Sequence, residues 1–452
     1  MDVSRIIDER KVDAFNVKLV AFSFLIVLLD GYDITAISFA APELIKAWGI
    51  TERSALGPVF SASLLGMLFG APGLGYVGDR YGRRVAIVAS SLIFGVFTWG
   101  VVLASSLNEL MILRFLAGIG IGGLLPNAIA LNAEFAPKRF RATMIILMFT
   151  GVTFGGALPG VVSVALVPKY GWQILFVIGG VLPIVAAAAA ALALPESIKY
   201  LVVRGGRRAQ IAALLAKMEP GLRVDANTQF TIQGEKAYAG FSVKQLFGDG
   251  LGAITPLLWL LFVINLMVFY FLLSWTPTLL TSANVPIAKA AIATTLFQLG
   301  GTVGGLVLAR PMDKMGLAPV ALLFAVSVPV IAAIGYVGVR SEALLMIVVF
   351  LGGFCVLGLQ FGLNATAAMI YPTSIRSNGA GWALGVGRVG SIAGPLVGGA
   401  LIAMKAPVQQ LYVIAAVPLL VGAIACFVFM RLYVGRFRGR GLGERDMQDA
   451  TR

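Results

Sequence analysis

Long apolar stretches alternate with short polar segments along the whole chain. Each apolar stretch is about 20 residues or longer, which is the length that an α-helix needs to cross the hydrocarbon core of a bilayer. The pattern therefore predicts twelve membrane-spanning helices and an all-α integral membrane protein. The predicted helices lie near residues 17–45, 55–78, 85–105, 109–134, 142–167, 171–194, 253–281, 287–309, 319–338, 342–370, 379–404 and 408–434.

One long polar stretch interrupts this series after the sixth predicted helix. Six helices precede it and six follow it, so we expect two pseudo-symmetric six-helix halves that are joined by a linker on the cytoplasmic side. The predicted segments are an N-terminal tail (1–16), a first half (17–194), the linker (195–252), a second half (253–434) and a C-terminal tail (435–452).

The composition fits a membrane protein. Hydrophobic residues make up 59% of the 452 residues and charged residues 12%, whereas soluble domains carry about 25% charged residues. The net charge of +14 would suit a nucleic-acid partner. The basic residues, however, are confined to tails and short loops between apolar segments, which is a sign of membrane topology and not of a DNA-binding face. We expect no nucleic-acid partner.

The positions of Lys and Arg also predict the orientation of the chain. Most of the 35 basic residues lie in the two tails, in the linker and in the loops after even-numbered helices. Because loops rich in Lys and Arg stay in the cytoplasm, both termini should be cytoplasmic, in the inner membrane of the cell. In this orientation the loops on the other side of the membrane contain Lys46, Arg53, Lys169, Lys289, Arg340 and Lys405. The first residues carry acids and lack a small-residue cleavage site, so we expect no cleaved signal peptide.

Two aspartates, Asp30 and Asp33, lie in the middle of the first predicted helix. A carboxylate at this depth costs about 2.5–3.5 kcal/mol on insertion scales, so it usually marks the path of an ion, a proton or a substrate. Residues at i and i+3 share a helix face. The chain has no histidine, so carboxylates are the candidates for proton coupling. The alternative is that one aspartate only caps or bends the helix at Gly31.

Two pairs of loops repeat between the halves. The sequence GYVGDRYGRR (75–84) follows the second predicted helix, and RPMDKMG (310–316) follows the eighth. APKRFR (136–141) follows the fourth helix, and YPTSIR (371–376) follows the tenth. Each pair is separated by nearly the same number of residues, which indicates a chain built from two related six-helix halves.

These features together resemble the major facilitator superfamily. The resemblance rests on the 75–84 loop, on Arg114 within RFLAGIGIGG (114–123) and on the Pro-Glu-Ser sequence at 195–197, and it covers nearly the whole chain. Within the superfamily, the D-G-Y-D run at 30–33 and the stretch GWALGVGRVGSIAGPLVGG (381–399) resemble the aromatic acid/proton symporter family. The second-half loop departs from the pattern: Ala309 stands where the first loop has Gly75, and no basic pair follows.

Two arginines lie inside predicted helices, and each has two interpretations. Arg388 is about 14 Å deep in the eleventh helix, where a guanidinium needs a partner or water. It would bind a substrate carboxylate through its bidentate fork, or form a structural ion pair with an acid of the first half. Arg114 would join the coupling network, or anchor the outer end of its helix by snorkelling.

A second group of charges lies at the cytoplasmic ends of the predicted helices. The superfamily resemblance implies that Glu134 forms a charge cluster with Asp79, Arg83 and Arg141, and that this cluster locks the cytoplasmic gate. Arg80 belongs to the same loop. Asp313 would be the weaker counterpart of the cluster in the second half.

Polar and aromatic residues of the second half could line a central cavity. An aromatic acid would need ring stacking and one or two hydrogen bonds, and the candidates for these contacts are Asn265 and Tyr270 in the seventh helix and Gln360 in the tenth. Ordinary packing is the alternative for each of them.

Other chemistries find little support. The G-x-G-x-x-G match at 118–123 follows no strand, so close helix packing explains it better than a nucleotide site. With no histidine and with Cys355 and Cys426 inside apolar segments, we expect no metal, no cofactor and no enzyme activity. A membrane sensor would need an output domain, which the short C-terminal tail does not provide.

The sequence thus predicts a secondary transporter that imports a small aromatic carboxylate of the benzoate or hydroxybenzoate class, with protons, by alternating access. The alternatives are a superfamily transporter or antiporter for another organic anion, a sugar acid or a drug. The expected partners are the substrate, protons and the bilayer. The oligomeric state is open, with a monomer favoured.

Overall fold

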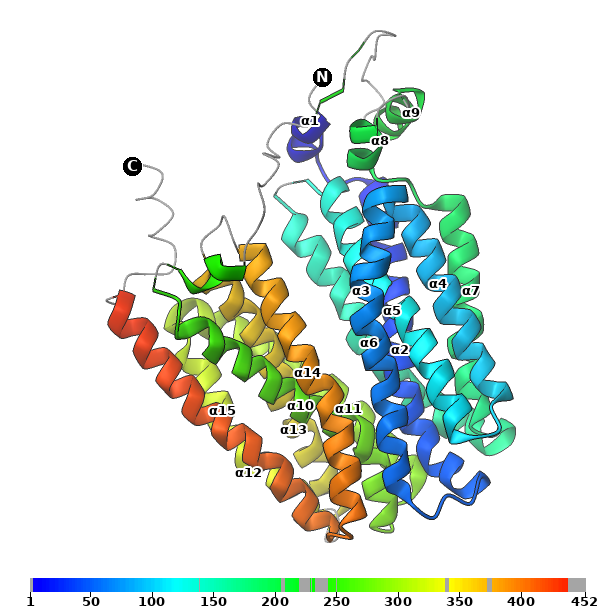
Figure 1. Cartoon of the computed structure of the whole chain (residues 1–452), viewed down its shortest axis with the longest axis vertical. Coiled ribbons are helices and arrows are strands. Elements are labelled where there is room, and N and C mark those ends of the chain that lie inside the picture. The colour runs from blue at the N-terminus through cyan, green and yellow to red at the C-terminus, as the bar shows by residue number, and fades with distance from the viewer. Residues whose placement is uncertain are drawn as a thin grey trace. The chain divides into compact units, whose positions relative to one another are not determined.

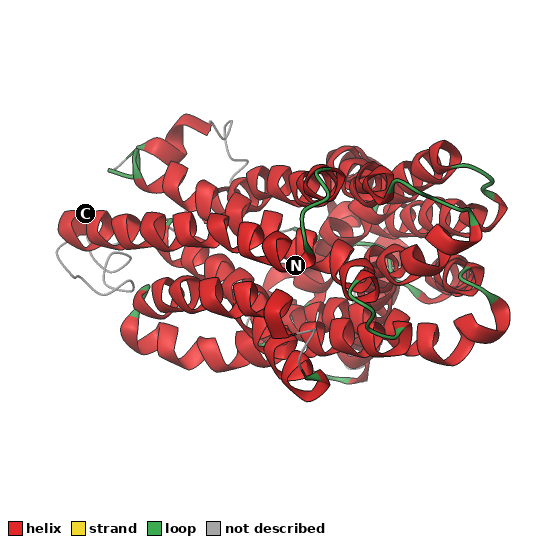
Figure 2. Cartoon of the chain, turned by 90° about the horizontal axis from the view of Figure 1, so that it is seen from below, coloured by secondary structure: helices red, strands yellow, loops and turns green. Residues whose placement is uncertain are grey.

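The computed structural model describes residues 3–137, 139–204, 208–218, 228, 230–231, 243–248, 250–337, 341–371 and 376–437. Helices account for nearly all of this part of the chain, and short loops connect them (Figure 2). The predicted C-terminal tail falls largely outside the described residues, and so do parts of the predicted linker.

Twelve helices of the described part are long and apolar enough to cross a membrane, which confirms the predicted fold class. They are α2 (Ala14–Ala47), α3 (Leu56–Tyr81), α4 (Arg83–Gly100), α5 (Leu107–Phe135), α6 (Arg141–Tyr170), α7 (Gln173–Ala193), α10 (Ile254–Ser282), α11 (Ile287–Met315), α12 (Ala318–Val337), α13 (Glu342–Ile370), α14 (Arg376–Ala403) and α15 (Val408–Phe437) (Figure 1).

The shorter elements lie between these helices or before them. They are α1 (Val3–Glu9), the 3₁₀ turns η1 (Arg53–Ala55), η2 (Val101–Leu103) and η3 (Val243–Phe247), and the helices α8 (Ile198–Arg204) and α9 (Arg208–Met218). The helices α8 and α9 follow the sixth long helix, at the start of the predicted linker.

The helices form two compact units. The first unit takes residues 1–36, 65–156 and 173–238, and the second takes residues 37–64, 157–172 and 239–452. The division passes through α2, α3 and α6, so one end of each of these helices belongs to the second unit. The predicted boundaries of the two halves, at 194 and 253, stay a prediction.

In the first unit, α4 packs against both α5 and α7. The break between α3 and α4 occurs at Gly82, whose φ of 108° lies in a region that residues with a side chain rarely adopt. The Glu196 carboxylate lies directly against this glycine and accepts a hydrogen bond from the backbone N–H of Arg84 at 3.2 Å. The glycine of the 75–84 loop is therefore needed for both its conformation and its close contact.

In the second unit, α10 packs against α14, α11 against α13, and α12 against α15. The end of α3 that belongs to this unit contacts the α10–α14 pair. The Trp275 indole, which is fully buried, donates a hydrogen bond to the carbonyl of Pro395 at 3.0 Å, and its ring meets that of Phe60 edge-on at 5.0 Å. The Ser61 hydroxyl donates to the carbonyl of Ile392 at 2.8 Å.

Candidate functional site

A buried ion pair joins α2 and α5 in the first unit. Nη1 of Arg114 lies 2.6 Å from Oδ2 of Asp33, and Nη2 donates to the backbone carbonyl of Asp33 at 3.3 Å. The Thr98 hydroxyl of α4 donates to the other carboxylate oxygen, Oδ1, at 2.9 Å. Three helices thus bring one charged or polar group each to a site with almost no solvent contact.

The carboxylate side of this buried pair is fully hydrogen-bonded, while Nε of Arg114 donates to no described residue. The side chains of Arg114 and Asp33 are 1% and 0% exposed. Removing two charges from water is costly, and the attraction between them compensates only when the geometry is close and further hydrogen bonds satisfy the remaining atoms. Here both oxygens of the Asp33 carboxylate accept a hydrogen bond, from Arg114 and from Thr98. The Arg114 guanidinium is thus paired and buried, and its part in a coupling network stays a prediction.

Close helix packing positions the two aspartates. A Cβ on Gly31, which lies between them, would come within 2.1 Å of the carbonyl oxygen of Val152 in α6. The neighbouring Tyr32 hydroxyl donates to the carbonyl of Leu175 in α7 at 3.1 Å. These two contacts fix the rotation of α2 about its axis. As a result Asp33 faces Arg114, and Asp30, one turn earlier, is also buried with 1% exposure.

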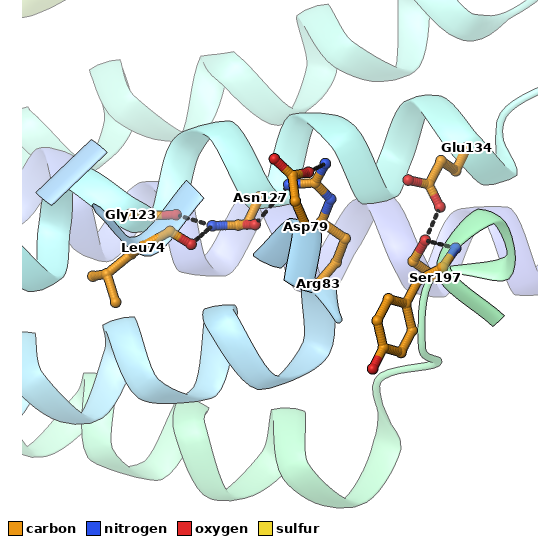
Figure 3. A network of polar contacts seen from close by, with 8 residues as sticks. Leu74, Asp79, Arg83, Gly123, Asn127, Glu134 and Ser197 are labelled. Carbon is orange, nitrogen blue, oxygen red and sulfur yellow. Dashed lines mark hydrogen bonds and ion pairs between the residues drawn. The ribbon is translucent and has the colours of Figure 1, made fainter. Parts of the chain in front are cut away.

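A cavity of about 690 Å³ opens at the end of the first unit that carries the start of α2. Residues of α1, α3, α5 and α8 line it, together with Arg83 and Arg141. Asp79 forms an ion pair with Arg83, whose Nη1 also donates to Oδ1 of Asn127 at 3.1 Å. The Asn127 amide in turn donates to the backbone carbonyls of Leu74 and Gly123, so this residue of α5 links α3 to the start of α4 (Figure 3).

The other predicted charges of this cluster line the same cavity but have different partners. Glu134 accepts a hydrogen bond from the Ser197 hydroxyl (Figure 3). Arg141 binds Asp8 of α1, with 2.7 Å between Nη2 and Oδ1. The structure therefore brings the predicted charges to one cavity, where Glu134 is also within electrostatic reach of Arg83, and it adds Asp8 and Ser197 to them.

Two further residues of the predicted gating network are not members of these pairs. Arg80 is exposed; its guanidinium lies 5.9 Å from the centre of the Tyr81 ring, and its backbone carbonyl accepts a hydrogen bond from Arg204. The backbone of Asp313 belongs to α11, and its side chain falls outside the described part of the structure.

Amide side chains of the second unit form a short chain between α10 and α13. Nδ2 of Asn265 donates to Oε1 of Gln360 at 3.0 Å, and Nε2 of Gln360 donates to Oδ1 of Asn364 at 3.3 Å. Asn265 is fully buried, and its Oδ1 accepts no hydrogen bond from any described residue. The structure thus brings two predicted substrate residues together and leaves one acceptor available.

Tyr270 lies further along α10 and is half-buried. Its ring meets that of Phe269 edge-on at 4.9 Å, and Phe269 is in turn stacked on Phe297 of α11 at 6.2 Å. The predicted aromatic lining is therefore a packed group of rings on α10 and α11.

Arg388 lies near the middle of α14 and is half-buried. The adjacent face of α14 packs closely on α10, because a Cβ on Gly390 would lie 2.1 Å from the carbonyl oxygen of Val263. Within the described residues, the Arg388 guanidinium has no ion-pair or hydrogen-bond partner. A partly exposed, unpaired guanidinium at this depth is suited to bind an anion.

The sequence reasoning missed Thr98, Asn127, Asp8 and Ser197. Thr98 and Asn127 have a signal in the sequence, because each is a polar residue in an apolar run. In the structure both are 0% exposed. Asp8 and Ser197 lie outside the long helices, where polar residues are ordinary, so only the fold could identify them as partners of Arg141 and Glu134. In the described part of the chain no group of three or more Cys, Asp or Glu residues is placed to hold a metal ion.

Comparison with known proteins supplies the context for this geometry. The sequence profile of the Major Facilitator Superfamily matches residues 23–341. The chain is 37% identical over 426 residues to a gallate transporter of Pseudomonas putida, with 94% of each chain covered. It is 36% identical over 423 residues to the 4-hydroxybenzoate transporter PcaK of Pseudomonas aeruginosa, with 92% of this chain and 93% of that protein covered.

The fold has a close relative among solved structures. A bacterial homologue of the human lysosomal transporter Spinster matches with a TM-score of 0.71 at 19% sequence identity, over 94% of this chain and 99% of the other. At this identity the match concerns the arrangement of the helices alone.

Proposed function

Because this chain belongs to the major facilitator superfamily, as its match over residues 23–341 shows, we propose that it imports a small aromatic carboxylate across the inner membrane together with one or more protons. The chain matches proteins that are named as transporters, and the match covers nearly the whole length of each. The protein is therefore a membrane transporter and not an enzyme. The substrate, the coupled proton and the residue roles below form the proposal.

The buried Asp33–Arg114 pair is the observation that carries the proton-coupling part. Protonation of Asp33 would remove the negative charge that Arg114 now faces at 2.6 Å. Because an isolated charge in a low-dielectric site is far more costly than a paired one, this change would alter the relative energies of the two access states. Asp30 and Asp33 are therefore the proposed proton-carrying residues, and Arg114 is the residue that responds to their charge.

The second unit supplies the proposed contacts to the substrate. Gallate and 4-hydroxybenzoate, after which the two relatives are named, both carry a carboxylate and at least one phenolic hydroxyl on one ring. The unpaired guanidinium of Arg388 would bind the carboxylate. The buried Oδ1 of Asn265, positioned by Gln360, would accept a hydrogen bond from the hydroxyl. Tyr270 would contribute to the aromatic wall.

The excess of basic residues in the tails, the linker and the even-numbered loops supports an orientation with both termini in the cytoplasm. In this orientation the cavity formed by α1, α3, α5 and α8 faces the cytoplasm. The pairs that line it, Asp79–Arg83, Glu134–Ser197 and Arg141–Asp8, would then stabilise one access state of the cytoplasmic gate.

The test is uptake of labelled acids into proteoliposomes with an imposed pH gradient. The panel contains benzoate, 4-hydroxybenzoate, gallate and gluconate, each with and without a protonophore. We expect accumulation of at least one of the three aromatic acids, collapse of that accumulation with the protonophore, and loss of accumulation in Asp33→Asn.

Two results would contradict parts of the proposal. Accumulation of gluconate in place of every aromatic acid would overturn the substrate class. A protonophore could leave the uptake of an aromatic acid unchanged, and Asp33→Asn could still accumulate that acid. Together these two results would overturn proton coupling and leave the substrate class intact.

A further inference from the structure

Three polar side chains follow one another along α2 at intervals of seven residues: Asn16, Ser23 and Asp30. Seven residues are nearly two helical turns, so the three lie on one face of the helix. Each of them is only 1% exposed. A polar row therefore leads through the interior of the first unit, from the start of α2 to the proposed proton carrier Asp30.

The first two members of this row bind α5. Nδ2 of Asn16 donates to the carbonyl of Phe135 at 2.9 Å, and Nδ2 of Asn132 donates to the Ser23 hydroxyl at 2.6 Å. Asn132 is buried, and its Oδ1 accepts no hydrogen bond from the described residues. Buried amide oxygens are normally satisfied by protein or by an ordered water molecule. The Ser23–Asn132 pair is therefore a buried polar position with one acceptor that no described residue uses.

The row is interrupted between Ser23 and Asp30. Val27 lies on the same face of α2, and it packs with Ala128 of α5 and Met148 of α6 in a cluster whose three members are all 0% exposed. Leu125, Ile129, Phe149 and Val152, which are apolar and partly buried, pack against this cluster. The sulfur of Met148 accepts a hydrogen bond from Nδ2 of Asn132 at 3.6 Å, so the cluster borders directly on the Ser23–Asn132 pair. The cluster is thus an apolar interruption that spans part of the roughly 10 Å between Ser23 and Asp30 along the helix.

The walls of this layer leave little room for water. At Gly31, next to Asp30, the backbones of α2 and α6 approach so closely that a Cβ would meet the carbonyl of Val152 at 2.1 Å. The ion pair of Asp33 and Arg114 lies about one turn further along α2 than Asp30. The charged residues of α6 lie at its two ends, Arg141 and Lys169, so α6 contributes no charge at this level.

We propose that Val27, Ala128 and Met148 form a proton seal, an apolar layer that separates Asp30 from the Ser23–Asn132 pair on the cytoplasmic side. The seal would keep Asp30 from exchanging protons with the cytoplasm through the interior of the first unit. A proton on Asp30 would then be released only in the state that also releases substrate. This inference rests on the proposed proton coupling. It adds three residues that would prevent proton flow without substrate.

The physical reason is that a proton crosses protein along water molecules or hydroxyl groups. Apolar side chains that fill a layer at full packing density leave no position where a water molecule would find the hydrogen bonds that it needs. A hydroxyl within the layer would supply one such position. It would connect the polar groups on the two sides of the layer.

The test uses the full chain in proteoliposomes that contain a pH-sensitive dye, with a pH gradient, valinomycin and potassium, and no substrate. The variants are Val27→Thr, which replaces one methyl by a hydroxyl, Ala128→Ser, and their combination. The matched control is Val17→Thr on the same helix, where the side chain is 60% exposed. Counterflow exchange of the labelled substrate identified for the wild type reports that each variant is folded and binds.

We expect proton entry without substrate to be about tenfold faster in the double variant than in the wild type or in Val17→Thr, which corresponds to a barrier lower by about 1.4 kcal/mol. Counterflow exchange should be retained, and accumulation of substrate at a given pH gradient should fall. Adding Asp30→Asn to the double variant should abolish the leak, because the leak passes through Asp30.

Three results would overturn the seal. The first is an unchanged proton leak in both single variants and in the double variant. The second is a leak that Asp30→Asn leaves in place, which would indicate a general packing defect. The third is a wild type that carries its substrate without protons, which would overturn the proposed coupling as well. If the wild type is proton-coupled but Val27→Thr and Ala128→Ser show no added proton leak, the seal is overturned and the proposed coupling stands.

Discussion

Arg114 and Asp33 form an ion pair that is closed off from solvent, with 2.6 Å between Nη1 and Oδ2 and with side chains that are 1% and 0% exposed. Arg141 and Asp8 form a pair of nearly the same length, 2.7 Å, with side chains that are 39% and 34% exposed. The two pairs have the same chemistry but different surroundings. Breaking them should therefore change the free energy of unfolding by different amounts.

Removing one partner of the buried pair should be strongly destabilising. Asp33→Asn leaves the Arg114 guanidinium buried without a counter-charge, and we expect a loss of about 3–5 kcal/mol in the free energy of unfolding. The double variant Asp33→Asn/Arg114→Gln should recover part of this loss, because it removes both charges. Thermal unfolding in detergent measures the effect. Thr98→Val, which removes only a neutral donor, is the control and should cost less. A double variant that is no more stable than Asp33→Asn would contradict the interpretation.

Removing one partner of the exposed pair should have little effect on stability. We expect Asp8→Asn to cost less than about 1 kcal/mol, because water screens the pair and solvates the charge that is left. The same thermal unfolding measurement, carried out at low and high salt, is the check. The small effect should become smaller still at high salt. A loss comparable to that of Asp33→Asn would mean that α1 contributes to stability through more than this contact.

The helix crossing at Gly31 predicts a steric effect. In Gly31→Ala the new Cβ would lie 2.1 Å from the carbonyl oxygen of Val152, so α2 and α6 must separate. We expect the uptake rate to fall sharply, with a lower unfolding temperature. Gly73→Ala in α3 is the matched control, since a Cβ there has no neighbour within 4 Å. It should be neutral or stabilise the helix by up to about 1 kcal/mol. Normal uptake and stability in Gly31→Ala would rule out this close crossing.

Arg388 should determine the affinity for the carboxylate. Arg388→Lys keeps the charge but removes the planar fork that binds a carboxylate through two hydrogen bonds. We expect KM for the transported acid to rise about tenfold or more, since a hydrogen bond to a charged group contributes about 1.5–3 kcal/mol. Arg431→Lys on α15, where the guanidinium lies 4.8 Å from the centre of the Phe427 ring, is the control and should leave KM unchanged. An unchanged KM in Arg388→Lys would remove Arg388 from the substrate site.

The sequence predicted the helices well because the signal is local. A run of apolar residues indicates a membrane-spanning helix without reference to any other part of the chain, and the structure has a long helix at each of the twelve predicted places. The burial of Asp30 and Asp33 followed from the same run. The helix ends were less certain: α2 extends from Ala14 to Ala47, beyond the predicted 17–45, because polar residues at the ends of a span continue the helix.

The partners of the charged residues could not be predicted in the same way. Arg114 had two interpretations, and only the packing of α5 on α2 pairs its guanidinium with Asp33. The hydroxyl of Thr98 on α4 donates to the other oxygen of the same carboxylate. The resemblance implied one cluster of Glu134 with Asp79, Arg83 and Arg141. In the structure Glu134 binds Ser197, while Arg141 binds Asp8. A residue pair 133 positions apart in the chain leaves no trace in a single sequence.

The sequence by itself determined that this chain is a twelve-helix membrane protein with two buried carboxylates in its first long helix. It did so because the energy of placing each residue in a bilayer depends on that residue and its immediate neighbours. The tertiary structure alone decided that Asp33 is paired, that the face of α2 leading to Asp30 is interrupted at Val27, and that Arg388 has no partner among the described residues. Those properties depend on which helices meet, and at which rotation, which is set by close contacts such as the one between Gly31 and Val152.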